Sequence, residues 1–287
     1  PAEPAPEQGE LLRGVPRVMM RVSLVIPVFN QLPLTRRCIE SLRPTTVSFD
    51  LVVVDNGSTD GTREFFQSFP YPDRLTYHRN AENLGLLKAL NQGWRLAHGE
   101  FVCFLHNDTE MREPRWLERL VQALDSDPSV GLAGLYGAKR IRRDGRYAGR
   151  TVVHCLADGP TLRVPVAEVA VVDGACLFLR RDFLEALGGF DEGYGFFHGY
   201  DKDLSFAVRE AGRRCVVVNA PFVHHGGRTR MSLMDGQSPG GGDLARRREA
   251  WAHFCQKWAN RLPCDVRSWR ERVRDRVSPK LTRGGAE

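Results

Sequence analysis

Short apolar runs alternate with amphipathic segments in the first third of the chain. Four runs have the β-branched and apolar composition of strands buried in a parallel sheet: residues 21–29, 51–54, 75–78 and 101–105. Three segments between them have helical periodicity: residues 33–42, 60–69 and 84–97. This alternation predicts βαβ units, and therefore a mostly parallel sheet whose ligands gather at the carboxyl ends of the strands.

The pattern changes after residue 114. A helix containing residues 116–124 is followed by irregular strands, which predict a mixed sheet: residues 130–135, 151–156 and 164–179. The basic stretch 139–146 has Asp144-Gly145 at its centre, which is typical of a hairpin tip. The remaining predicted elements are a helix at 200–211, a strand at 215–218 and terminal helices at 244–258 and 266–277. The chain is therefore predicted to be an α/β protein with a Rossmann-like, mostly parallel central sheet, a mixed second half and C-terminal helices.

Composition is that of a globular protein, with 42% apolar and 26% charged residues. The seven cysteines are dispersed and form no C-x-x-C motif, so we expect buried, reduced thiols. No apolar run approaches the roughly 20 residues that span a bilayer, and the amino end lacks signal-peptide features. We therefore expect a cytoplasmic protein, with residues 1–20 a flexible lead.

Polar residues follow three of the predicted strands. Asn30 follows the first strand, and Asp55 and Asn56 follow the second. At the edge of a sheet, Asp55 could accept hydrogen bonds from a uracil imide or a ribose hydroxyl. Asp and Asn also favour turns intrinsically, so a structural role at the turn is the alternative.

A second group of candidates has the chemistry of metal ligands. Asp108, in the segment His106-Asn107-Asp108 after the fourth strand, is an oxygen ligand suited to a hard cation, although it could equally cap a loop. His224 and His225 offer imidazole ligands. Neighbouring side chains diverge in extended chain, so at most one of the two histidines binds a metal.

Two carboxylates lie at the start of the helix predicted at 200–211. Asp201 and Asp203 could each act as a general base toward an acceptor hydroxyl. Asp is also a preferred N-cap residue, and Asp201 is well placed for that structural role.

Taken together, these segments resemble the family 2 glycosyltransferases, from residue 22 to residue 227. The motifs that carry the resemblance are VSLVIPVFN (22–30), VVVDNGSTDGT (52–62), NLGLLKALNQG (83–93), FLHNDTE (104–110), GGFDE (188–192), GYDKDLSFAVREAG (199–212) and HHGG (224–227). The resemblance implies a GT-A fold within residues 21–230. Its nucleotide-sugar-binding half would be 21–110 and its acceptor half 111–230, with a loop and helices at 231–287. It also admits a rhamnosyltransferase-like subgroup.

The resemblance implies a nucleotide pocket formed by residues of the first three motifs, together with His106 and Asn107 of the fourth: Pro27, Val28, Asn30, Asp55, Asn56, Asn83, Gly85, Asn91, His106 and Asn107. The family's metal motif, acid-x-acid, aligns with His106-Asn107-Asp108 and lacks its first acid here. Asp108 is then the surer ligand, and His106 is either a substitute ligand or a ribose contact. His224 or His225 matches a third ligand found in some relatives. The implied cofactor is Mn²⁺ or Mg²⁺, with a shift toward Mn²⁺.

The family's base motif, Glu-Asp before a helix, aligns with Tyr200-Asp201. Asp201 therefore inherits the role of base, with Asp203 as second choice. The implied reaction is an inverting single displacement from a UDP- or dTDP-sugar to a hydroxyl of a glycan, lipid-linked or small-molecule acceptor. Bacterial surface polysaccharide is one such acceptor class.

Other functions are less well supported by the sequence. The missing acids at His106 and Tyr200 leave a catalytically inactive sugar-nucleotide-binding or partner-binding protein as the alternative. A dehydrogenase is disfavoured because Pro27 to Asn30 replaces a G-x-G-x-x-G loop. Only the net charge of +6 favours nucleic acid, so none is expected as a partner. The aromatic and basic terminal helices either pack on the domain or contact an anionic membrane peripherally.

Overall fold

A computed structural model describes residues 10–12, 21–70, 74–148, 152–157, 162, 164–226 and 243–277. Most of the predicted N-terminal lead, the loop after residue 226 and Gly227 of the HHGG motif lie outside these ranges.

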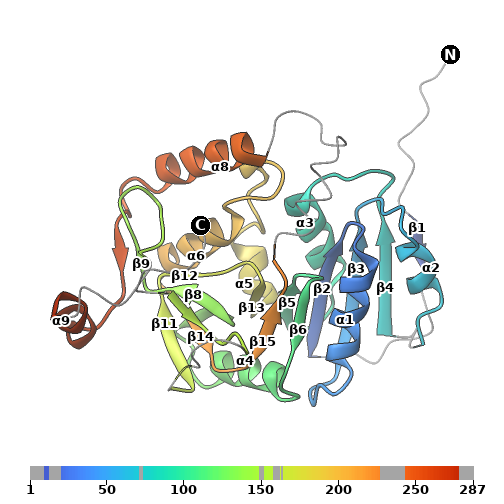
Figure 1. The fold of residues 1–287 in the computed structure, drawn as a ribbon, viewed down its shortest axis with the longest axis horizontal. Helices are drawn as coiled ribbons and strands as arrows, with labels where there is room; N and C mark the ends of the chain where they lie inside the picture. Colours follow the sequence, from blue (N-terminus) through green and yellow to red (C-terminus); the bar gives the residue numbers. More distant parts are fainter. Residues whose placement is uncertain are drawn as a thin grey trace.

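A nine-stranded sheet forms the centre of the protein (Figure 1). In spatial order its strands are β1 (Glu10–Leu12), β4 (Leu75–Arg79), β3 (Phe49–Asp55), β2 (Val22–Val28), β5 (Phe101–Leu105), β13 (Cys176–Arg180), β7 (Val130–Gly134), β14 (Arg214–Val218) and β11 (Val166–Val169). Neighbouring strands are parallel from β4 to β5 and between β7 and β14, whereas β1, β13 and β11 run antiparallel to their neighbours. The predicted mostly parallel sheet is confirmed.

The parallel half contains the predicted strand–helix alternation. Every residue of β2 is buried, as its mostly apolar sequence predicts. Its helices are α1 (Leu32–Leu42), α2 (Thr62–Gln67) and α3 (Leu86–Leu96). Helix α3 packs on β2 and β3 through residues at helical spacing, including Leu87, Leu90 and Trp94. The loops after β2, β3 and β5 therefore open at one edge of the sheet.

The second half adds small sheets to the central one, as its irregular pattern predicts. Their paired strands are β10 (Val152–His154), β8 (Tyr136–Ala138) and β12 (Val171–Val172); β15 (Phe222–His224) and β6 (Thr109–Met111); and β16 (Cys264–Asp265) and β9 (Arg140–Ile141). The helices are α4 (Trp116–Asp125), α5 (Arg181–Ala186), the 3-10 turn η3 (Glu192–Tyr194) and α6 (Tyr200–Glu210). The hairpin tip is confirmed, because Arg142 and Arg146 pair across Asp144-Gly145.

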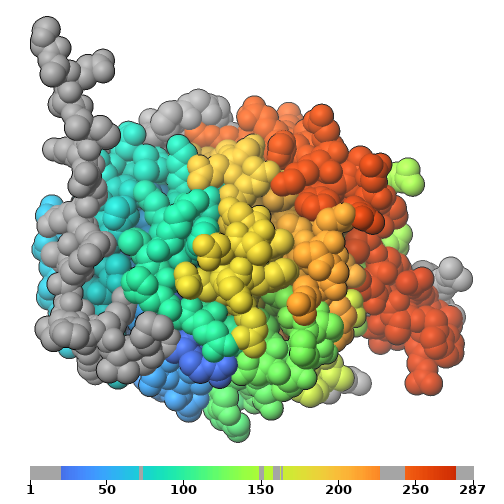
Figure 2. All heavy atoms as spheres, turned by 180° about the vertical axis from the view of Figure 1, so that it is seen from behind, coloured from blue at the N-terminus to red at the C-terminus, as the bar shows by residue number. Residues whose placement is uncertain are grey.

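The C-terminal helices are α8 (Asp243–Lys257) and α9 (Trp269–Val277), which lie along one side of the molecule (Figure 2). Phe254 is 1% exposed and packs edge-on against Phe206 of α6, which Trp258 also contacts. The packing interpretation is therefore correct for α8. Trp269 of α9, by contrast, is 70% exposed.

Three further expectations can be compared with the structure. Five of the seven cysteines are buried and all seven are free, as predicted. Among the described residues, no helix is long and apolar enough to cross a membrane. The prediction that the whole 1–20 segment lies outside the fold is wrong for Glu10–Leu12, because these residues pair with β4 as an edge strand. A strand of three residues is too short to produce a periodic signal.

Candidate metal and donor site

A cavity of about 320 Å³ lies at the edge of the sheet where the loops after β2, β3 and β5 meet the start of α6. Its lining includes Pro27, Val28, Asn56, Asn83, His106, Asn107, Asp108, Asp201 and His224, all predicted site residues. Carboxyl ends of parallel strands share one edge of a sheet, which explains why residues so distant in sequence meet here.

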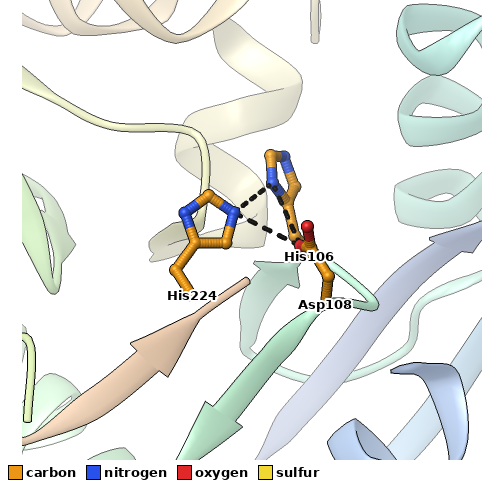
Figure 3. Close-up of side chains that lie close together, drawn as sticks. All are labelled: His106, Asp108 and His224. Carbon is orange, nitrogen blue, oxygen red and sulfur yellow. Dashed lines mark hydrogen bonds and ion pairs between the residues drawn. The ribbon is translucent and has the colours of Figure 1, made fainter. Parts of the chain in front are cut away.

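His106, Asp108 and His224 form a compact cluster in the cavity wall (Figure 3). Their ligand atoms all lie within 4.8 Å of one another. His224 Nε2 lies 3.3 Å from Asp108 Oδ1 and 3.4 Å from His106 Nδ1, and His106 Nδ1 lies 4.0 Å from Asp108 Oδ1. Two imidazole nitrogens and one carboxylate oxygen that converge in this way fit a divalent transition metal.

The electrostatics of Asp108 favour the ionised, metal-binding form. Burial alone would raise the pKa of this carboxyl, which is 6% exposed. The hydrogen bond with His224 and the nearby His106 outweigh burial and hold the pKa below its usual value. Asp108 is therefore a carboxylate at neutral pH.

Strand pairing explains which of the two adjacent histidines joins the cluster. β15 pairs antiparallel with β6 and places His224 opposite Thr109, the residue after Asp108. The side chain of His225 points away and its Nε2 lies 2.6 Å from Glu110 Oε1. Successive side chains diverge in extended chain, so His224 lies in the cluster and His225 outside it.

Asp201 lines the cavity from the first turn of α6. The N-cap of this helix is Gly199, so the capping interpretation of Asp201 is wrong. Burial, followed by the neighbouring Asp173 carboxylate, raises the pKa of Asp201 above its ordinary value. A carboxylate with a raised pKa at a cavity wall is a stronger proton acceptor than an exposed one.

Asp203, the second choice for the base, lies outside the cavity lining. Its carboxylate accepts hydrogen bonds from Tyr194 Oη at 2.8 Å and Trp258 Nε1 at 2.8 Å, and Lys257 Nζ lies 2.9 Å away. The residue is 5% exposed. Asp203 comes two positions after Asp201, which rotates its side chain by about 200° around the helix, away from the cavity. Asp203 therefore connects α6 to η3 and α8.

We expect Asp203→Asn to lower the free energy of unfolding by roughly 1–3 kcal/mol, because it replaces a buried carboxylate that accepts hydrogen bonds from Tyr194 and Trp258 with a weaker amide acceptor. Urea denaturation measures this. Glu118→Gln, at an exposed ion pair with Arg115, is the control and should change stability little. An Asp203→Asn variant as stable as the wild type would contradict the structural role.

Asp55 and Asn30 support the cavity wall from behind. Asp55 is fully buried, and its carboxylate accepts hydrogen bonds from the backbone N–H of Ser58 at 2.8 Å, Tyr77 Oη at 2.5 Å and Arg79 Nη1 at 3.1 Å. The side chain of Asn30 accepts from the backbone N–H of Thr59 at 2.8 Å. Neither belongs to the cavity lining, so here the structure matches the turn alternative.

Asn91 is also turned away from the cavity. Its amide nitrogen donates to the Phe190 carbonyl and to Glu192, and its amide oxygen accepts from Trp94 Nε1 and the backbone N–H of Phe190. These hydrogen bonds hold the GGFDE segment against α3, and the structure does not bring Asn91 to the cavity lining.

Asn83 and Gly85 are linked by a hydrogen bond, but Gly85 does not belong to the cavity lining. Asn83 lines the cavity, and its side-chain oxygen accepts from the backbone N–H of Gly85 at 3.0 Å. Gly85 has a φ of 93°, and a Cβ atom there would lie 3.0 Å from the Phe196 carbonyl oxygen. Only glycine combines this conformation with so close an approach.

Five residues of the cavity lining lie outside all of the motifs quoted above: Asp173, Gly174, Phe196, Phe197 and His198. Asp173 directly follows β12. This two-residue strand was not separated from the strand region predicted at 164–179, so Asp173 was not recognised as a polar residue at the end of a strand. Phe196 to His198 lie in an irregular loop with no periodic signal. His198 Nε2 lies 2.8 Å from Asp243 Oδ1, which connects this loop to α8.

Known proteins share both the sequence and the fold. The family model "Glycosyl transferase family 2" matches residues 23–188. The chain is 32% identical over 224 residues to the uncharacterized protein y4gI of Sinorhizobium fredii, covering 71% of this chain and 24% of that protein. It is 29% identical over 245 residues to the O-antigen biosynthesis protein RfbC of Myxococcus xanthus, covering 77% of this chain and 18% of that protein.

Among solved structures, the mannosyltransferase PcManGT of Pyrobaculum calidifontis, in complex with GDP-Man and Mn²⁺, superposes with a TM-score of 0.56 at 21% identity. The match covers 84% of this chain and 70% of that one. The chain thus spans a quarter or less of the two sequence relatives, and the structural likeness at this identity supports the fold alone. Because the family model covers more than half of the chain, the protein belongs to the family 2 glycosyltransferases, with a GT-A fold.

Proposed function

We propose that this chain transfers a sugar, with inversion, from a nucleoside diphosphate donor to an acceptor hydroxyl, assisted by a divalent metal at His106, Asp108 and His224. The charge of the cavity supports this most directly. Three carboxylates, from Asp108, Asp173 and Asp201, line it, and among the described lining residues there is no lysine or arginine. An anionic diphosphate would be repelled by this surface unless a cation lay between them.

The donor would lie across the parallel half of the sheet. Pro27, Val28 and Asn83 line this side of the cavity and offer apolar contacts and an amide group to a nucleoside. Asn56 and Asn107 also line it, and their amide nitrogens donate to Gly85 and Thr35 within the fold. We propose a UDP- or dTDP-sugar from the family resemblance. GDP belongs in any screen, because the PcManGT structure contains GDP-Man.

Each chemical requirement of the transfer has a residue at the cavity. When bound, the metal would act as a Lewis acid toward the departing diphosphate. Asp201 would accept the proton of the incoming hydroxyl, and its raised pKa suits that task. The acceptor would be a glycan, lipid-linked or small-molecule hydroxyl bound on the Asp173 side.

The donor set indicates which metals should bind. Magnesium prefers an oxygen-only octahedral site, whereas imidazole ligands favour Mn²⁺, Co²⁺ and Zn²⁺. We therefore expect UDP, dTDP or GDP to raise the melting temperature more with Mn²⁺ or Co²⁺ than with Mg²⁺ at equal concentration. Thermal unfolding across this panel measures both the nucleotide and the metal.

Two outcomes would count against the proposal. An absence of response to every nucleotide, with and without metal, would contradict a donor site and favour a partner-binding protein. Nucleotide binding without hydrolysis or transfer of any sugar in the cognate sugar-nucleotide series would favour the inactive alternative, which the departures at His106 and Tyr200 motivate.

A further inference from the structure

Two departures from the family's motifs contact each other directly. His106 stands where the metal motif has its first acid, and Tyr200 stands where the base motif has its glutamate. In the structure, His106 Nε2 lies 2.7 Å from the hydroxyl of Tyr200. Ninety-four positions separate the two residues along the chain, so only the tertiary fold brings these two changes together.

The contact with Tyr200 occupies one ring nitrogen of His106 and leaves the other nitrogen for the metal cluster. Nε2 is engaged by Tyr200, whereas Nδ1 faces His224 Nε2 at 3.4 Å and Asp108 Oδ1 at 4.0 Å. Neutral imidazole carries a proton on one nitrogen and a lone pair on the other. A ring that donates from Nε2 to the Tyr200 hydroxyl presents its Nδ1 lone pair to a metal.

The surroundings hold the tyrosine in place for this contact. Tyr200 is 6% exposed, and its ring packs edge-on against Phe190 with centroids 5.8 Å apart. A Cβ atom at position 174 would lie 2.0 Å from the Tyr200 hydroxyl oxygen, so Gly174 provides the space that this oxygen occupies. The Tyr200 hydroxyl therefore has little freedom to leave His106.

We propose that Tyr200 is a positioning residue, whose hydroxyl orients the His106 imidazole so that Nδ1 serves as a ligand of the divalent metal. This inference rests on the proposed metal site. Partners that orient metal-binding histidines typically contribute 10- to 100-fold to metal affinity. His106 and Tyr200 would thus replace, as a pair, the first acid of the family's metal motif and the glutamate of its base motif.

The test compares two Tyr→Phe variants, each of which removes one buried hydroxyl group. Tyr200→Phe removes the contact with His106, and Tyr194→Phe removes a hydrogen bond to Asp203, outside the cavity lining. Mn²⁺ is titrated into the full chain, alone and with UDP or GDP, while electron paramagnetic resonance measures the free ion. We expect the Mn²⁺ dissociation constant to rise about 10- to 100-fold in Tyr200→Phe and to stay at the wild-type value in Tyr194→Phe.

A second variant approaches the same contact from the other side. Gly174→Ala keeps the hydroxyl but displaces it, and we expect it to weaken Mn²⁺ binding in the same direction. The visible spectrum of bound Co²⁺ should change in Tyr200→Phe and remain as in wild type in Tyr194→Phe, because the first alters the geometry around the ion.

The outcomes separate this inference from the function on which it rests. If wild type binds Mn²⁺ and Tyr200→Phe binds it equally well, or if Tyr194→Phe weakens binding as much, the role of Tyr200 is refuted and the metal site stands. If wild type binds no Mn²⁺ or Co²⁺ with any nucleotide, the metal site and the role of Tyr200 both fail.

Discussion

Asp201→Asn should reduce turnover by about 10²- to 10⁴-fold while donor binding survives, because the amide cannot take a proton from the acceptor hydroxyl. Substrate consumption under saturating donor measures the rate, and nucleotide-dependent thermal stabilisation measures donor binding. Asparagine is nearly isosteric with aspartate, so the cavity should keep its shape.

The pH dependence provides a second readout for Asp201. A base must be deprotonated to act, and burial and Asp173 raise the pKa of Asp201. The rate should therefore fall on the acid side at a higher pH than an ordinary aspartate would give, and this limb should be absent from the residual activity of Asp201→Asn.

Asp203→Asn is the matched control for catalysis, because it changes the same residue type on the same helix, outside the cavity lining. It should lower stability yet leave the turnover of the folded enzyme near the wild-type value. The reverse result, with Asp203→Asn inactive and Asp201→Asn active, would contradict the assignment of the base.

Asp108→Ala should abolish the metal-dependent part of nucleotide binding. Asp108 is the only carboxylate in the His-Asp-His cluster, and without it only two neutral imidazoles remain as ligands there. A ligand at about 100 times its dissociation constant adds roughly 2.7 kcal/mol of stability, and this increment should disappear in the variant. Thermal unfolding with nucleotide, with and without Mn²⁺, measures it.

Glu110→Gln is the control for Asp108→Ala. Glu110 lies two residues further along the chain and contacts His225 and Arg112 instead of the cluster. Its substitution should leave the metal-dependent increment intact. If Asp108→Ala kept that increment, the metal would have to bind elsewhere.

Local pattern was sufficient for most of the fold. The runs that became β2, β3 and β5 are mostly apolar because both faces of the sheet are covered, and α3 shows helical spacing because one side packs on the sheet. β6 was missed, and β12 was not separated from the strand region predicted at 164–179, because elements of two or three residues are shorter than any periodic signal.

The candidate site was predicted less evenly, and the reason is the same for each error. Three residues have the residue types of a binding or catalytic site but form hydrogen bonds within the fold instead: Asn91, Asp55 and Asp203. Those partners lie on other elements, so local sequence does not reveal them. Asn56 and Asp108, placed directly after parallel strands, line the cavity as expected, because sheet topology determines their position.

The sequence alone determined the α/β class, the strand–helix order and the family, because each of these depends on short-range periodicity and on motifs that can be compared directly. Tertiary structure decided which acid of Asp201 and Asp203 faces the cavity, which of His224 and His225 joins Asp108, and that Tyr200 contacts His106. These outcomes depend on helix rotation, strand register and contacts between residues far apart in the chain, and the three-dimensional packing specifies all three.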